Sequence, residues 1–227
     1  MKRLVAGLGL AALALGFLAP GAVSAAPAKP KPAVVAPDDS APAAPVKPAA
    51  TIPYGHVYLI RGIGNFLSHG IDTFETELKA RGVPVSIYNH RNEDILLDDV
   101  TAGYRKDKGN VPIIIIGHSL GANAAILLSN KLGDRGIPVR LVVTFDHVLD
   151  MPPLTNNAAE LIDYYKPPFG HPTNVVPGFK GPVMSTNLEG HADVTHDSID
   201  KTPAYHQVVL DKIMTILKKK PKPTAKG

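Results

Sequence analysis

The sequence predicts an α/β fold in which helices cover both faces of a mostly parallel, doubly wound sheet. Apolar segments of strand length alternate with segments of helical spacing, an order typical of parallel strands joined by helices. Residues 111–116 are apolar throughout, as expected of a strand that helices cover from both sides. The length of 227 residues suits one such domain with flanking segments.

The first half of the domain contains two strand–helix pairs. Residues 56–60 read His-Val-Tyr-Leu-Ile and predict a short strand that ends before a glycine-containing loop. Residues 71–81 have helical spacing, with Phe74 and Leu78 on one face. The second strand and the second helix are expected at residues 84–88 and 95–104.

The second half begins with the apolar strand at residues 111–116 and continues with an Ala-rich helix at residues 122–132. A fourth strand is predicted at residues 140–145. After Asp146, Pro and Asn residues interrupt the pattern up to about Gly181, so this stretch is expected to be irregular. The last strand and the last helix are predicted at residues 182–188 and 203–217.

The N-terminus is typical of a secretory signal peptide covering residues 1–25. Lys2 and Arg3 precede an apolar run at residues 4–18, and small residues at 23–25 predict cleavage before Ala26. We therefore expect an exported protein, periplasmic or secreted. The alternative is an uncleaved membrane anchor, which is disfavoured because the run is shorter than the roughly 20 residues that span a bilayer.

Two further segments flank the domain that we predict at residues 53–217. Residues 26–52 are an Ala/Pro-rich linker, with too many prolines for a helix and too few large apolar side chains for a core. Residues 218–227 form a basic tail, which either is simply solvated or makes weak contact with an anionic envelope surface.

Charge and cysteine content exclude several classes of function. The formal net charge is +4, but residues 53–217 contain 14 Lys and Arg against 18 Asp and Glu, a net charge of −4. Because the positive charge lies in the flanking segments, the domain is not expected to bind nucleic acid. The chain has no cysteine, which excludes disulfides, thiolate metal sites and a cysteine nucleophile.

The motif that carries chemistry is Gly-His-Ser-Leu-Gly at residues 117–121, between a predicted strand and a predicted helix. In a GxSxG turn, the serine hydroxyl is exposed above the sheet, and the glycines relieve crowding around the turn. This context predicts Ser119 as a nucleophile. The alternative is an ordinary glycine-rich strand-to-helix turn.

A serine nucleophile needs a base and a third group that orients the base, and in this arrangement the acid precedes the histidine along the chain. Asp146 follows the fourth predicted strand, at the same carboxyl edge of the sheet as Ser119, and is the predicted acid. Asp150, in the following loop, is the nearest alternative.

The predicted base is His196, which lies between the last strand and the last helix. His191, in the same loop, is the alternative. His206 falls within the last helix and is expected to pack there or face solvent. His118 is expected to support the turn at Ser119, and His147 to lie near the acid.

An oxyanion hole needs two backbone N–H donors, one from the residue after the nucleophile and one from the loop after an early strand. These are Leu120 and either Gly62 or Ile63. The chain contains neither the GxxxxGK[ST] nor the GxGxxG pattern of phosphate and dinucleotide sites. We expect no cofactor and no metal ion.

Residues from about 56 to 217 resemble α/β hydrolases, in particular small thioesterase and lipase-like members. The likeness rests on the GxSxG turn, the small-residue helix after it and the strand that ends at the acid. It implies an acyl-enzyme mechanism through Ser119, Asp146 and His196 without a cofactor. The segment from Asp146 to His196, which lie 50 positions apart, is too short for the large lid of many lipases.

The sequence therefore predicts a serine hydrolase of the esterase, lipase or thioesterase type, acting on a small-molecule acyl ester or thioester. The segment at residues 151–179, with Tyr164, Tyr165 and Phe169, is expected either to form a wall of the acyl site or to pack within its own loop. The alternative functions are a catalytically inactive hydrolase-fold binding protein of the cell envelope and a structural protein acting through its basic tail.

Overall fold

The computed structural model describes residues 55–63 and 68–218. The predicted signal peptide, the linker and all of the basic tail except Lys218 lie outside the described residues. Within the described part of the chain, no helix is long and apolar enough to cross a membrane.

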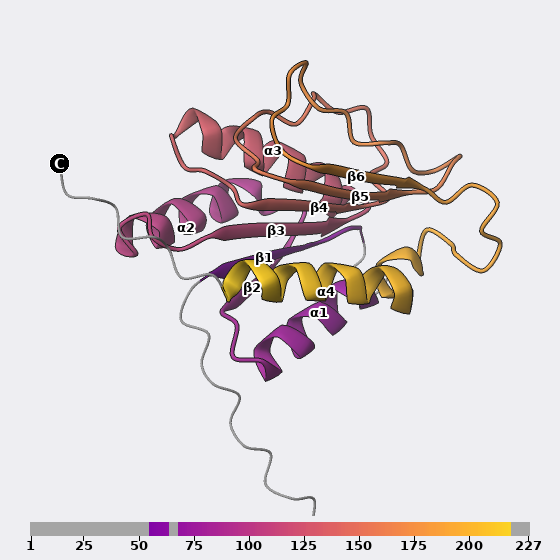
Figure 1. The fold of residues 1–227 in the computed structure, drawn as a ribbon, viewed down its shortest axis with the longest axis horizontal. Helices are drawn as coiled ribbons and strands as arrows, with labels where there is room; N and C mark the ends of the chain where they lie inside the picture. Colours follow the sequence, from indigo (N-terminus) through magenta and orange to yellow (C-terminus); the bar gives the residue numbers. More distant parts are fainter. Residues whose placement is uncertain (1–54, 64–67, 219–227) are drawn as a thin grey trace, which may run out of the picture. The chain divides into compact units, whose positions relative to one another are not determined.

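A six-stranded, all-parallel sheet forms the centre of the domain, in the order β2-β1-β3-β4-β5-β6 (Figure 1). The strands are β1 (His56–Arg61), β2 (Val85–Asn89), β3 (Ile113–His118), β4 (Leu141–Phe145), β5 (Leu161–Tyr165) and β6 (Val183–Asn187). The chain adds β2 on one side of β1 and all later strands on the other side. Ligands bind at such a switch point, in the crevice outside the carboxyl ends of the strands.

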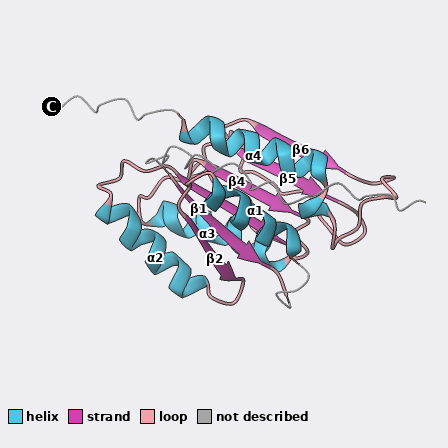
Figure 2. Cartoon of the chain, turned by 90° about the horizontal axis from the view of Figure 1, so that it is seen from below, coloured by secondary structure: helices cyan, strands magenta, loops and turns pink. Residues whose placement is uncertain are grey.

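In the described part of the chain, four α-helices cover the two faces of the sheet, which confirms the predicted doubly wound architecture (Figures 1 and 2). One face carries α1 (His69–Ala80) and α4 (Pro203–Leu217), and the other carries α2 (Glu93–Lys106) and α3 (Leu120–Asp134). A short 3₁₀ turn, η1 (Ile199–Lys201), precedes α4. The predicted elements agree with the observed ones to within two residues at each end.

The alternation of side chains along the strands creates a separate core on each face. In β3, Ile114 and Ile116 pack beneath α1 and α4, whereas Ile113 and Ile115 pack beneath α2 and α3. Because both faces are buried, apolar side chains are favoured at successive positions, and this explains the unbroken apolar run at residues 111–116. His206 belongs to the first core, where its ring stacks on Phe74 with centroids 3.7 Å apart.

The segment after Asp146 corrects the prediction. It was expected to be irregular up to about Gly181, but it contains β5, which pairs with β4 and β6. The strand escapes a pattern search because it is only five residues long and has Asp163 at its centre. Each carboxylate oxygen of Asp163 accepts two hydrogen bonds, so this buried charge is satisfied.

Candidate active site

The turn between β3 and α3 consists of Ser119 alone, because β3 ends at the residue before it and α3 begins at the residue after it. Ser119 has φ 58° and ψ −126°, a conformation that is unfavourable for a residue with a side chain. Its backbone N–H donates to the carbonyl of Phe145 at 2.9 Å. The strained turn is thereby fixed to the neighbouring strand β4.

Glycines surround this turn because other backbone segments approach it closely. A Cβ atom on Gly117 would overlap the carbonyl of Gly121, and one on Gly121 would overlap the carbonyl of Ile60 in β1. Both glycines are thus required for the start of α3 to pack against the sheet. This is the crowding expected from the GxSxG pattern.

The structure brings Ser119, His196 and Asp146 together. His196 Nε2 lies 3.0 Å from Ser119 Oγ, and His196 Nδ1 lies 2.7 Å from Asp146 Oδ2. Asp146 is fully buried, and its other carboxylate oxygen accepts the backbone N–H of Lys166 at 2.6 Å. The hydroxyl, the imidazole and the carboxylate therefore form one continuous hydrogen-bonded line.

The carboxylate changes the acid–base behaviour of the imidazole. The hydrogen bond from His196 to Asp146 raises the pKa of His196 above its usual value of 6.5, although burial acts in the opposite direction. A buried carboxylate favours the protonated imidazole beside it. His196 is thus suited to take a proton from Ser119.

The two alternative residues lie elsewhere. Asp150 is exposed in the loop after β4, and the side chain of His191 is exposed as well. Among the described residues, neither side chain forms a hydrogen bond with Ser119 or His196. The geometry therefore favours Asp146 over Asp150 and His196 over His191.

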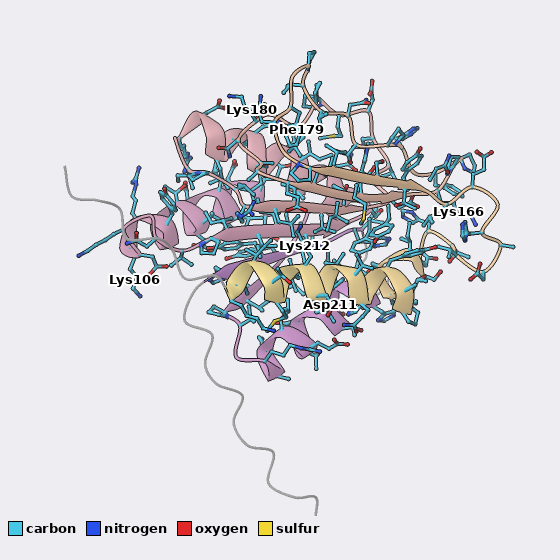
Figure 3. All side chains as sticks on the ribbon, viewed as in Figure 1. Lys106, Lys166, Phe179, Lys180, Asp211 and Lys212 are labelled. Atoms are coloured by element: carbon cyan, nitrogen blue, oxygen red, sulfur yellow. The ribbon has the colours of Figure 1, made fainter. Side chains whose placement is uncertain are left out.

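Sequence reasoning missed Lys166, which lies at the carboxyl end of the sheet (Figure 3). Its backbone N–H binds Asp146, and its ammonium group donates to the carbonyls of His191 and Val194. Lys166 thus connects the acid to the loop that carries His196. A lone lysine in a Pro-rich segment carries no sequence signal for this role.

The loop after β1 approaches Ser119 closely. A Cβ atom on Gly62 would lie 2.8 Å from Ser119 Cβ, so only glycine fits at this approach. However, the N–H of Gly62 donates to Ser68 Oγ at 3.0 Å. Of the two oxyanion-hole donors predicted from this loop, Ile63 is therefore the remaining candidate. The other predicted donor is Leu120, at the first position of α3.

The aromatic residues expected at an acyl site do not form one wall. Tyr164 lies in the core, where its ring stacks on Phe145 with centroids 5.5 Å apart, and Tyr165 ends β5. Only Phe169 is exposed near the site, with its ring centroid 6.2 Å from that of His196.

A cavity of about 190 Å³ lies instead against the loop after β4, and His147, the residue after Asp146, contributes to its lining. Its lining consists of Ile126, His147, Asp150, Met151, Pro152, His171, Pro172 and Asn174. Most of these residues belong to the predicted 151–179 segment. That segment therefore borders a cavity, but with aliphatic, proline and polar side chains in place of the tyrosines.

Searches against protein-family models and against curated proteins found no match. Solved structures do match, among them the product of the gene lin2722 from Listeria innocua, at 15% identity and a TM-score of 0.50 over 75% of this chain and 96% of that one. A cutinase-like protein from Cryptococcus sp. gives 14% identity and a TM-score of 0.48 over 77% of this chain and 100% of that one.

The RedJ thioesterase from the prodiginine biosynthetic pathway in Streptomyces coelicolor gives 14% identity and a TM-score of 0.47, over 74% of this chain and 92% of that one. Identities this low concern the fold alone. The parallel sheet, the serine on a tight turn after its central strand and the chain order serine, aspartate, histidine are the features of one architecture. This chain has the α/β-hydrolase fold.

Proposed function

We propose that this protein is a serine hydrolase that cleaves a carboxylic ester or thioester through an acyl-enzyme intermediate. The observation that carries the proposal is the hydrogen-bonded line from Ser119 Oγ through His196 to Asp146, with distances of 3.0 and 2.7 Å. A serine is a weak nucleophile on its own, and such a line supplies both a base and a group that orients it.

In the acylation step, Ser119 Oγ attacks the acyl carbonyl while His196 Nε2 takes the hydroxyl proton. The resulting imidazolium is stabilised by Asp146, to which its Nδ1–H donates. His196 then gives the proton to the leaving alcohol or thiol as the tetrahedral intermediate collapses. In the second step, His196 activates a water molecule that releases the acid from Ser119.

Negative charge on the tetrahedral oxygen requires N–H donors. We assign these to Leu120, whose amide is at the start of α3 and has no partner within the helix, and to Ile63. The positive end of the α3 dipole points to the same place. Removing one such donor typically lowers kcat by about 10²–10³ fold.

The proposal is tested with a fluorophosphonate probe and a short p-nitrophenyl ester. Ser119→Ala in the full chain is expected to abolish labelling and to lower kcat by about 10⁴–10⁶ fold, as the loss of a nucleophile does in other serine hydrolases. Mass spectrometry of the labelled wild type should locate the adduct on Ser119. An unmodified Ser119, or equal turnover in the variant, would refute the proposal.

A further inference from the structure

A buried chain of hydrogen bonds joins the segments that carry the proposed catalytic groups. His118 Nε2 lies 2.8 Å from the backbone carbonyl oxygen of His196, and His118 Nδ1 lies 3.1 Å from Ser68 Oγ. Ser68 Oγ in turn accepts the N–H of Gly62. His118 and Ser68 are completely buried. The chain thus runs from the base loop, through the residue before the nucleophile, to the loop after β1.

The direction of each hydrogen bond follows from its chemistry. The carbonyl of His196 can only accept, so His118 Nε2 carries the hydrogen. Burial lowers the pKa of His118, against the opposing effect of the Asp200 carboxylate, so its imidazole is neutral near pH 7. Nδ1 therefore accepts the hydroxyl hydrogen of Ser68, and each group has a fixed role.

A second contact, made by Asp200, holds the loop that carries His196 four residues further along the chain. Asp200 Oδ2 accepts the N–H of Ile71 in the first turn of α1 at 3.1 Å and lies 4.0 Å from His118 Nδ1. Asp200 is fully buried against Gly70, where a Cβ atom would overlap it. α1 lies on the sheet face opposite α3 (Figure 2). The segment from His196 to Asp200 is thereby attached at both ends.

We infer that His118 is a positioning residue that holds the backbone of His196 and the loop at Gly62 in place relative to Ser119. This inference rests on the proposed function. The base must stay within about 2.6–3.2 Å of the hydroxyl. The loop that carries His196 contacts the turn at Ser119 through His118. A displacement of about 1 Å at a catalytic group can lower the rate 10² fold.

Three substitutions separate the two contacts of His118. His118→Gln places an amide near the position of Nε2 and keeps a donor to the carbonyl of His196. His118→Asn places an amide near the position of Nδ1 and keeps only the contact with Ser68. His118→Leu keeps neither contact. Turnover of a p-nitrophenyl ester is measured per active site, counted by fluorophosphonate labelling. We expect kcat to fall in this order, by about 10–100 fold for His118→Leu, with KM within about threefold of the wild type.

The control is Leu132→Ala, a buried residue near the other end of α3, roughly 20 Å along the helix from Ser119. It should lower Tm without changing kcat per labelled site. If His118→Leu does not fold, Ser68→Ala and His118→Gln carry the test, and their combined effect on kcat should be less than additive because both act on one chain.

Two outcomes would overturn the positioning role: wild-type kcat in His118→Leu, or a loss confined to KM. A loss in His118→Gln as large as that in His118→Leu would also contradict the assignment of the Nε2 contact. Absence of labelling in the wild-type protein would instead mean that the proposed function fails. Normal labelling of the wild type, with unaltered kcat across the His118 series, would refute the positioning role alone.

Discussion

Ser119 and Asp146 both have a positive backbone φ, of 58° and 56° respectively. Each comes directly after a strand, and each donates its backbone N–H to the next strand, Ser119 to Phe145 and Asp146 to Tyr164. A positive φ at a residue with a side chain costs about 1–3 kcal/mol. The backbone hydrogen bonds of the sheet thus continue one residue beyond β3 and β4. They hold Ser119 and Asp146 where their side chains contact His196.

The two histidines in the loop before α4 give a direct test at this scale. His196→Ala should lower kcat nearly as much as Ser119→Ala, because the two residues act as one unit and their effects do not add. His191→Ala is the matched control, since its exposed side chain is removed from the same loop while its carbonyl still binds Lys166. We expect it to change kcat less than threefold. A larger loss in His191→Ala than in His196→Ala would transfer the role of base to His191.

The pH dependence of the reaction follows from the raised pKa of His196. Only the neutral imidazole can take the proton of Ser119, so kcat/KM should fall as pH drops through that pKa, which lies above 6.5. Asp146→Asn removes the carboxylate that raises the pKa. The acid limb of the profile should then move to lower pH, while the maximal rate falls by roughly 10⁴ fold. An acid limb at the same pH in both proteins would contradict this assignment.

At the scale of elements, most strands and helices could be predicted from the sequence because both cores impose a regular apolar pattern. β5 could not, since its central residue is charged and its partners are far away in the sequence. The carboxylate of Asp163 is satisfied by Thr144 in β4, Ser185 in β6 and Thr173 in the following loop. No local pattern in the sequence indicates that these four residues meet.

The buried aspartates Asp163 and Asp146 should respond differently to substitution, because Asp163 holds three segments of the fold together and Asp146 contacts His196. Asp163→Asn replaces an acceptor oxygen with an NH₂ group that faces donors, so we expect it to destabilise the fold by about 2–4 kcal/mol with little change in kcat of the folded enzyme. Asp146→Asn should instead impair kcat. Urea unfolding combined with active-site labelling measures both properties. Loss of turnover in fully folded Asp163→Asn would show that β5 contributes to catalysis directly.

The three side chains of the candidate site could be predicted from the sequence, but the contacts that hold them in place could not. Ser119, Asp146 and His196 each follow a strand, and parallel strands bring their carboxyl ends to one edge. The contacts that hold these residues, through Lys166 and His118, use backbone carbonyls of a distant loop. Such contacts depend on the folded path of the chain, and residue types alone do not specify them.

At the scale of the whole molecule, the switch point between β1 and β3 determines where the site lies. β1 ends just before Gly62, and β3 ends just before Ser119, so the strands on either side of this point bring the loop of Gly62 and the proposed nucleophile to the same edge of the sheet. The later strands β4 and β5 then bring Asp146 and Lys166 to the same edge. The topology thereby gathers residues that are more than 100 positions apart in the chain.

The whole chain also carries the prediction of export, which concerns residues outside those described. The apolar run at residues 4–18 is long enough for a signal peptide and short for a membrane span. When the full chain is produced in a bacterial host, we expect the exported form to begin at Ala26 and to be soluble outside the inner membrane. N-terminal sequencing of that form decides the matter. If Met1 were retained in a membrane fraction that resists carbonate extraction, the folded domain would instead be anchored through the proline-rich segment that precedes it.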